Sequence, residues 1–225
     1  MAKHDVRYYG SQYVVSTTTP TITFAGAPVS GDIVVLAYGA FYDAVSVPPS
    51  GFTLLDAWDG SGDAGKVSFY AKLAGGSEPT SYSATIASER DCGGVGYVIE
   101  GPFASLEALT FSARQNHADA PSATILSSAS SLAQAGIAIA FTAVAYGATY
   151  AAISGWSNSF TAQTRGGGSS AHIDTAYRVY ASADSGVQTV ATFGANTWGA
   201  AWLLRITESG GGDPDDGLPP FFFFD

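Results

Sequence analysis

Short runs rich in β-branched and aromatic residues recur along the chain, and Gly, Pro, Ser, Asn or Asp ends each run. No stretch keeps the capped, amphipathic pattern of a helix. We therefore predict an all-β chain with almost no helix. The clearest predicted strands are Asp32–Tyr42, Phe52–Trp58, Lys66–Leu73, Ser81–Ala87, Gly94–Glu100, Gly136–Ala145, Phe160–Thr164, His172–Tyr180, Gln188–Phe193 and Gly199–Thr207. Shorter runs predict edge strands at Val6–Tyr9, Tyr13–Ser16 and Thr21–Phe24, and further strands at Leu106–Phe111 and Ala123–Leu126.

Residues 31–101 and 136–207 carry the same features in the same order, at an offset of about 105 residues. We match Gly31-Asp-Ile-Val-Val-Leu36 with Gly136-Ile-Ala-Ile-Ala-Phe141, Tyr70-Ala-Lys-Leu73 with Tyr177-Arg-Val-Tyr180, and Gly94-Val-Gly-Tyr-Val-Ile99 with Gly199-Ala-Ala-Trp-Leu-Leu204. The chain is therefore predicted to contain two pseudo-repeated halves.

Each half supplies about five strands, and a five-stranded antiparallel sheet has an apolar face that must be covered. The simplest prediction is one β-sandwich over residues 1–208, in which the halves cover each other with pseudo-twofold symmetry. Its strands either stay within their own sheet or exchange in a jelly-roll-like manner. Two separate small sandwiches joined through residues 102–135 are the alternative.

Aromatic residues follow glycines at Gly51-Phe52 and Gly155-Trp156. We expect the chain to turn at the glycine and the ring to close the end of the sandwich. The alternative is that aromatic rings stack on sugars, and the candidates for this role are Trp58, Trp156 and Trp198.

From Ser209 the sequence changes to an acidic, Gly-rich segment that is predicted to be an extended linker. It leads to an apolar tail that needs a pocket, because four consecutive phenylalanines in water would promote aggregation. We predict that this tail, in residues 209–225, anchors the protein to a partner through Leu218, Pro219, Pro220, Phe221, Phe222, Phe223 and Phe224.

The balance of charge limits the choice of partners. The net charge is −10 and the chain has only nine Lys and Arg residues, so neither nucleic acid nor an anionic membrane is expected as a partner. The uncharged stretch Gly136–Ile153 has no flanking basic anchors, which favours a buried strand over a membrane span. Met1–Asp5 lacks the apolar core of a signal peptide, so we expect synthesis in the cytoplasm.

No arrangement of residues predicts catalysis, a metal site or a cofactor. The three histidines have no metal-ligand spacing, and the acidic loop Asp56–Asp63 lacks the closing Glu of a calcium loop, so we expect a hairpin there. Gly166–Ser170 has no following Lys-Ser/Thr and is predicted to be a turn. Nothing pairs the glutamates across a cleft, so we expect no enzyme.

Several motifs resemble a family of β-sandwich proteins associated with the virions of tailed phages and prophages. They are Gly31-Asp-Ile-Val-Val-Leu36, Pro48-Pro-Ser-Gly-Phe52, Phe69-Tyr-Ala-Lys-Leu73, Glu78-Pro-Thr-Ser-Tyr82 and, in a degenerate second half, Trp202-Leu-Leu-Arg205. The resemblance covers residues 30–207 and concerns structural motifs. Leu218–Asp225 has no counterpart in it.

The resemblance implies a structural virion protein, such as a head decoration, a head fibre or a tail-associated protein. Its expected partners are capsid, portal or tail components, and its expected assembly is a homo-oligomer, with a trimer as our specific prediction. The alternative is an adhesin that binds a host surface glycan.

Overall fold

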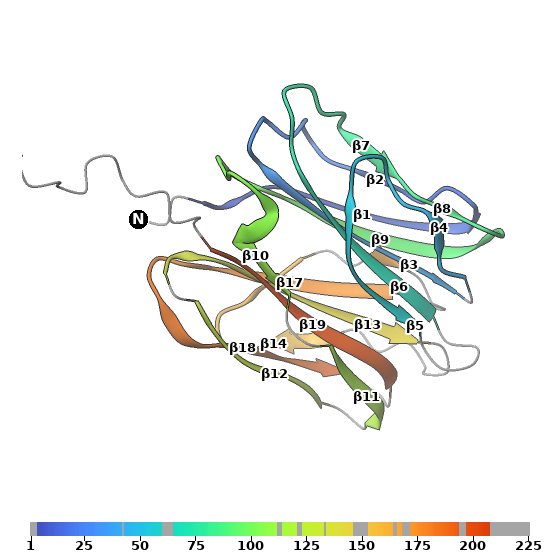
Figure 1. Ribbon diagram of the computed structural model, residues 1–225. Helices are drawn as coiled ribbons and strands as arrows, with labels where there is room; N and C mark the ends of the chain where they lie inside the picture. The colour runs from blue at the N-terminus through green and yellow to red at the C-terminus, as the bar shows by residue number, and fades with distance from the viewer. Residues whose placement is uncertain are drawn as a thin grey trace, which may run out of the picture.

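The computed structural model describes residues 4–41, 43–59, 65–111, 114–120, 123–132, 134–145, 153–163, 166–167, 172–193 and 197–207. Within these residues one short 3₁₀ turn, Leu106–Ala108, is the only helical element, and the strand pairs are antiparallel. The predicted all-β, antiparallel fold is confirmed. Figure 1 shows the strands β1 to β9 in the upper part of the molecule and β11 to β19 in the lower part.

The first half of the chain forms a large sheet with a smaller layer outside it. The large sheet has the order β1-β9-β3-β6-β5, and the outer layer consists of two ladders, β2-β7 and β4-β8. The strands are β1 (Val6–Thr17), β2 (Thr21–Thr23), β3 (Ile33–Phe41), β4 (Val45–Val47), β5 (Thr53–Asp59), β6 (Gly65–Leu73), β7 (Ser81–Ser83), β8 (Thr85–Ile86) and β9 (Arg90–Ile99).

The second half repeats this plan. Its large sheet has the order β10-β19-β13-β17-β15, where β11 also pairs with β19 and β16 with β17, and its outer sheet has the order β12-β18-β14. The strands are β10 (Leu109–Phe111), β11 (Gln115–Ala120), β12 (Ala123–Leu132), β13 (Gly136–Ala145), β14 (Ile153–Trp156), β15 (Thr161–Ala162), β16 (Gly166–Gly167), β17 (His172–Tyr180), β18 (Asp184–Phe193) and β19 (Thr197–Thr207).

The predicted repeat is confirmed at the level of strands. The middle of the large sheet consists of β9, β3 and β6 in the first half and of β19, β13 and β17, in the same order, in the second half. β10 and β11 take the place of β1, and β15 and β16 that of β5. The edge strand β1 lies against β16 of the other half, and Arg114, just before β11, donates a hydrogen bond to the carbonyl of Ala57 on β5. Each first edge therefore faces the other half's last edge, as a pseudo-twofold axis requires.

Two of the residue-level matches between the halves are wrong. Leu36 faces the outer layer of its half, whereas its predicted match Phe141 lies in the core between the halves. Tyr70 likewise lies in the outer core of its half, whereas its predicted match Tyr177 packs against the central core. A shift of one residue exchanges the faces of a strand, so similar strand sequences can be aligned on the wrong face.

The largest core lies between the two large sheets and explains why their strands are apolar at consecutive positions. Alternate residues of β3 point in opposite directions: Ile33, Val35 and Ala37 into the central core, and Val34 and Leu36 into the outer core of the first half. A second outer core, which includes Leu132, Phe160 and Leu203, fills the other half. The halves cover each other as predicted, but each is also covered on its outer side, so the molecule has four β layers.

Glycines on β9 allow the outer layer of the first half to pack closely. A Cβ atom on Gly96 would lie 2.8 Å from Phe24, and one on Gly94 would lie 2.9 Å from Ile22. The run Gly93-Gly94-Val95-Gly96, which is unfavourable for an isolated strand, is therefore required by the layer above it.

The predicted strands are present, with shifted ends in several cases. β13 and β17 have the predicted bounds, and the predicted Val6–Tyr9 and Tyr13–Ser16 form the single strand β1. β4, β11, β14 and β16 were not predicted, and the predicted turn at Gly166–Ser170 is wrong at Gly166–Gly167, because β16 pairs there with β17. Strands remain within the sheets of their own half, which decides between the two arrangements left open above. No helix among the described residues has the length and apolar character needed to span a membrane.

Candidate functional site

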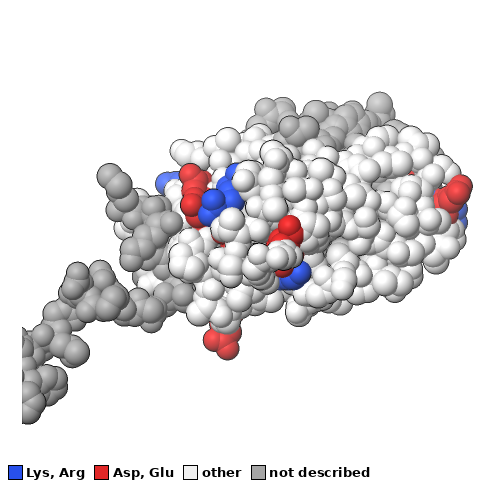
Figure 2. All heavy atoms as spheres, turned by 90° about the horizontal axis from the view of Figure 1, so that it is seen from above, with Lys and Arg blue, Asp and Glu red and all other residues white. Residues whose placement is uncertain are grey.

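Charged side chains form a few separate groups on a largely uncharged surface. Figure 2 shows broad stretches without Lys, Arg, Asp or Glu on the face that carries the outer layer of the first half. One group lies where β1 begins and where β19 ends, and we call this part of the sandwich the terminal end. Its side chains are the strongest candidates for chemistry in the described chain.

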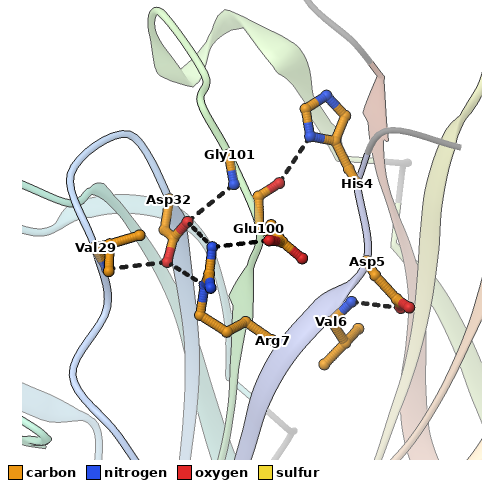
Figure 3. Close-up of polar contacts among 8 residues, drawn as sticks. All are labelled: His4, Asp5, Val6, Arg7, Val29, Asp32, Glu100 and Gly101. Atoms are coloured by element: carbon orange, nitrogen blue, oxygen red, sulfur yellow. Dashed lines mark hydrogen bonds and ion pairs between the residues drawn. The ribbon is translucent and has the colours of Figure 1, made fainter.

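A buried carboxylate forms the centre of this group (Figure 3). Asp32, which is completely buried, accepts a hydrogen bond of 2.9 Å from Arg7 Nε. Its two oxygens also accept hydrogen bonds from the backbone N–H groups of Val29, at 3.0 Å, and Gly101, at 2.9 Å. A second guanidinium nitrogen of Arg7 lies 3.1 Å from the half-exposed carboxylate of Glu100.

The local backbone sets up this arrangement. Gly31 has φ +88°, a conformation that favours glycine, and its N–H and carbonyl bond to Ala74 and Phe103. Asp32, the next residue, is thereby placed between the segment before β3 and the segment after β9. Burial alone would lower the pKa of Arg7, but its hydrogen bond to Asp32 and the charges of Asp32 and Glu100 raise it.

The N-terminal segment is attached at the same place. The His4 ring stacks on Phe103 with ring centres 4.3 Å apart, and its Nδ1 lies 2.7 Å from the Glu100 carbonyl oxygen. The N–H of Glu100 donates a hydrogen bond to the carbonyl of Asp5. The group therefore joins the start of β1 to β3 and β9.

A second polar group closes the neighbouring part of the terminal end. Glu78 is almost fully buried and accepts hydrogen bonds from Lys72 Nζ, the Tyr82 hydroxyl and the Gly75 N–H, all at 2.8–2.9 Å. Burial acts to raise the pKa of Glu78, but these hydrogen bonds outweigh it and hold the pKa below its usual value. Burial and the bond to Glu78 raise the pKa of Tyr82.

The predicted role of Gly51-Phe52 in closing the sandwich is confirmed. Gly51 has φ +79°, and Phe52 packs edge-on against Tyr82, with ring centres 5.1 Å apart, on the outer core. The turn predicted at Gly155 is wrong, because Gly155 lies within β14 and pairs with Thr192. Trp156, the last residue of that strand, is half-buried and packs against the outer core of the second half.

The three tryptophans proposed for sugar stacking lie in different surroundings. Trp58 is only 7% exposed and packs edge-on against Trp202 in the central core, so the stacking role predicted for it is wrong. Trp198 belongs to β19, but its side chain lies outside the described residues, as do all the predicted anchor residues from Leu218 to Phe224. Of the predicted site residues whose side chains are described, Trp58 and Trp156 belong to different cores and are not brought together.

Both polar groups at the terminal end are built to hold strands together. Asp32 and Glu78 use their oxygens in hydrogen bonds to cations, backbone and a hydroxyl, which is the arrangement expected of buried structural carboxylates. No group of three or more His, Cys, Asp or Glu side chains that could hold a metal occurs in the described part of the chain. The sequence contained one signal for the first group, since Asp32 stands directly before a fully apolar strand and needs a partner there.

Comparison of the chain with protein-family models, curated proteins and solved structures gave no match. The class that the structure defines is an antiparallel β-sandwich of two repeated halves. The resemblance to virion-associated phage proteins depends on the sequence motifs alone.

Proposed function

We propose that this protein is a non-enzymatic structural component of a tailed-phage virion, attached to the particle through its C-terminal tail. The motifs that resemble virion-associated β-sandwich proteins support the virion context. The described structure adds a suitable scaffold, because four stacked β layers enclose hydrophobic cores and the polar groups of the terminal end attach the N-terminal segment to them.

One observation carries the attachment hypothesis. β19, the last described strand, ends at Thr207 on the terminal end, where β1 also begins (Figure 1). The sequence that follows is a Gly- and Asp-rich segment and then an apolar peptide with four phenylalanines. An anchor joined at this point would leave the opposite end of the sandwich directed away from the particle.

Burial of the phenylalanine rings of the tail would supply free energy for attachment. Burial of one Phe side chain contributes about 1.5–3 kcal/mol before ordering costs are subtracted. Several tails on one oligomer would dock as an effectively intramolecular set, which increases the overall affinity without new contacts.

The test uses a phage whose genome encodes this chain. We expect the full-length protein in purified particles, and we expect truncation after Ser209 to remove it. Replacement of Phe221 to Phe224 by Ser should have the same effect while keeping the length. As a matched control, replacement of Asp213, Asp215 and Asp216 by Ser changes the linker charge but keeps the rings, and should leave incorporation unchanged.

Quantitative mass spectrometry of the particles measures the outcome. Incorporation of the Ser variant at the full-length level would refute the anchor. Absence of the full-length protein from purified particles would refute the virion assignment itself.

A further inference from the structure

β1 is a long edge strand whose central stretch, Tyr8–Val14, is uncharged. Among the described residues its only strand partner is β9, with which Tyr8 to Val14 pair in unbroken register. From Tyr8 to Thr17 the strand contains no charged residue and no proline. Its side chains Tyr13 and Val15 are 39% and 62% exposed. Backbone groups on the side away from β9 are a template for another strand.

The opposite edge of the same sheet has features that prevent strand addition. β5 carries Asp56 and Asp59 and has a register shift between Leu54 and Asp56. Charges and bulges on edge strands are common ways of blocking edge-to-edge pairing. β1 also carries Arg7 and has register shifts, between Val6 and Tyr8 and between Val14 and Thr17, so the comparison favours strand addition only along its regular, uncharged stretch Tyr8–Val14.

The sequence of β1 is complementary to itself in an antiparallel pair. With Ser11 opposite Ser11 of a second copy, Tyr9 of each chain faces Tyr13 of the other, and Tyr8 faces Val14. Aromatic pairs and pairs of aromatic with β-branched residues are favourable across strands. The regular stretch contains no charged residue, so this register brings no like charges together despite the net charge of −10; Arg7 and Val15 lie outside it, at the register shifts of β1.

We propose that two copies of the chain associate through antiparallel pairing of their β1 strands. The paired large sheets then form one continuous sheet across a twofold axis. Such a contact uses the same edge on both chains and is closed, so it gives a dimer and not a fibre. This inference goes beyond the proposed function, does not depend on it, and replaces the trimer expected from the sequence with a pair.

The register places Ser11 of one chain opposite Ser11 of the other, within the regular stretch. Ser11→Lys or Ser11→Glu would bring two like charges together in the dimer, and we expect the affinity of each variant alone to fall about fivefold. An equal mixture of the two variants can pair Lys with Glu, so its heterodimer should have at least about fivefold higher affinity than either homodimer. Leu54→Lys, at an exposed position on β5, is the control and should leave affinity unchanged.

The experiment measures the molar mass of the full-length chain by light scattering after size-exclusion chromatography over a concentration series. A species of about twice 23.0 kDa is expected for the wild type. Hydrogen exchange should show backbone amides within Tyr8–Val14 that become protected only at concentrations where this species forms. Circular dichroism of both Ser11 variants confirms that they are folded.

Three results would overturn the proposal. They are a chain that remains a monomer at high micromolar concentration, a species of three chains, and a mixture of the Ser11→Lys and Ser11→Glu chains that associates no more tightly than either variant alone. The first would show that the edge is unoccupied, and the others that association uses a different surface.

Discussion

Phe69 offers the most direct test of how the two halves depend on each other. Its ring, on β6 of the first half, is completely buried, and three aromatic rings surround it: Trp202, Phe111 and Phe141, with ring centres 4.7, 5.1 and 5.2 Å away. All three rings belong to residues that come after the strands of the first large sheet in the sequence. Phe69→Ala would therefore leave a cavity between the large sheets, with little opportunity for the rigid β layers to close it.

Removal of a buried Phe side chain costs about 3–5 kcal/mol when the surroundings cannot relax. For a chain of this size each kcal/mol lowers Tm by roughly 2–4 °C, so we expect a decrease on the order of 10 °C. Differential scanning calorimetry measures both Tm and the number of transitions. If the halves shield each other's apolar faces, the wild type and the variant should each unfold in one transition.

Two results would refute this reasoning. One is a pair of resolved transitions of which Phe69→Ala moves only one, because independent halves would lose only their own stability. The other is a loss below about 1 kcal/mol, because the site would then be loosely packed. Leu54→Ala, on the exposed side of the neighbouring strand β5, is the control and should cost less than about 0.5 kcal/mol.

Three further predictions concern single ionisable groups. Asp32→Asn keeps the size of the side chain but leaves Arg7 without its buried partner, so thermal unfolding should show a loss of about 3 kcal/mol, whereas Glu100→Gln, at the exposed end of the group, should cost under about 1 kcal/mol. The folded-state pKa of Glu78 is below its unfolded value, so its contribution to stability is present above the unfolded pKa and is lost as the pH falls through the folded pKa. Urea titrations should therefore show that the wild type loses more stability at acid pH than Glu78→Gln does. Parallel pH profiles of the two proteins would contradict the assignment. Burial, with smaller contributions from Asp91 and Asp43, raises the pKa of Cys92 to about 12, so a maleimide should label it only when the protein is unfolded, and rapid labelling of the native chain would show that the thiol is accessible.

The strands were predictable because the residues that form them are locally consistent. β13 and β17 combine β-branched and aromatic residues with clear turn signals on both sides, and their ends agree with the prediction. β4 and β14 are short, and they are strands only because they cover the outer faces of the large sheets, so no local pattern identifies them. The faces of individual residues were harder to predict, as Leu36 and Tyr70 show, because strands that are buried on both sides lack the alternation that fixes a register.

The polar group at the terminal end could be predicted only in part. Asp32 next to an apolar strand implies a buried pair, but the partner Arg7 is separated from it by the whole of β2, and Glu100 by most of the first half. Pairing across such distances is determined by the topology of the sheet, in which β1 and β9 are neighbours. The same topology places Trp58 inside the molecule, because β5 lies over β19 and the Trp58 ring packs against the Trp202 ring.

The low content of charged residues follows from this architecture. Each large sheet is covered on both faces, so long strands such as β3 and β13 offer water little surface except at their ends. The short outer strands expose hydroxyls that bond to one another, as Thr21 does with Ser83 and Thr23 with Ser81. Charges are then needed mainly where strands end and the chain turns, which is where Arg7, Asp32, Lys72 and Glu78 lie. A composition with 12% charged residues is thus a consequence of stacking four β layers, and gives no information by itself about the medium in which the protein acts.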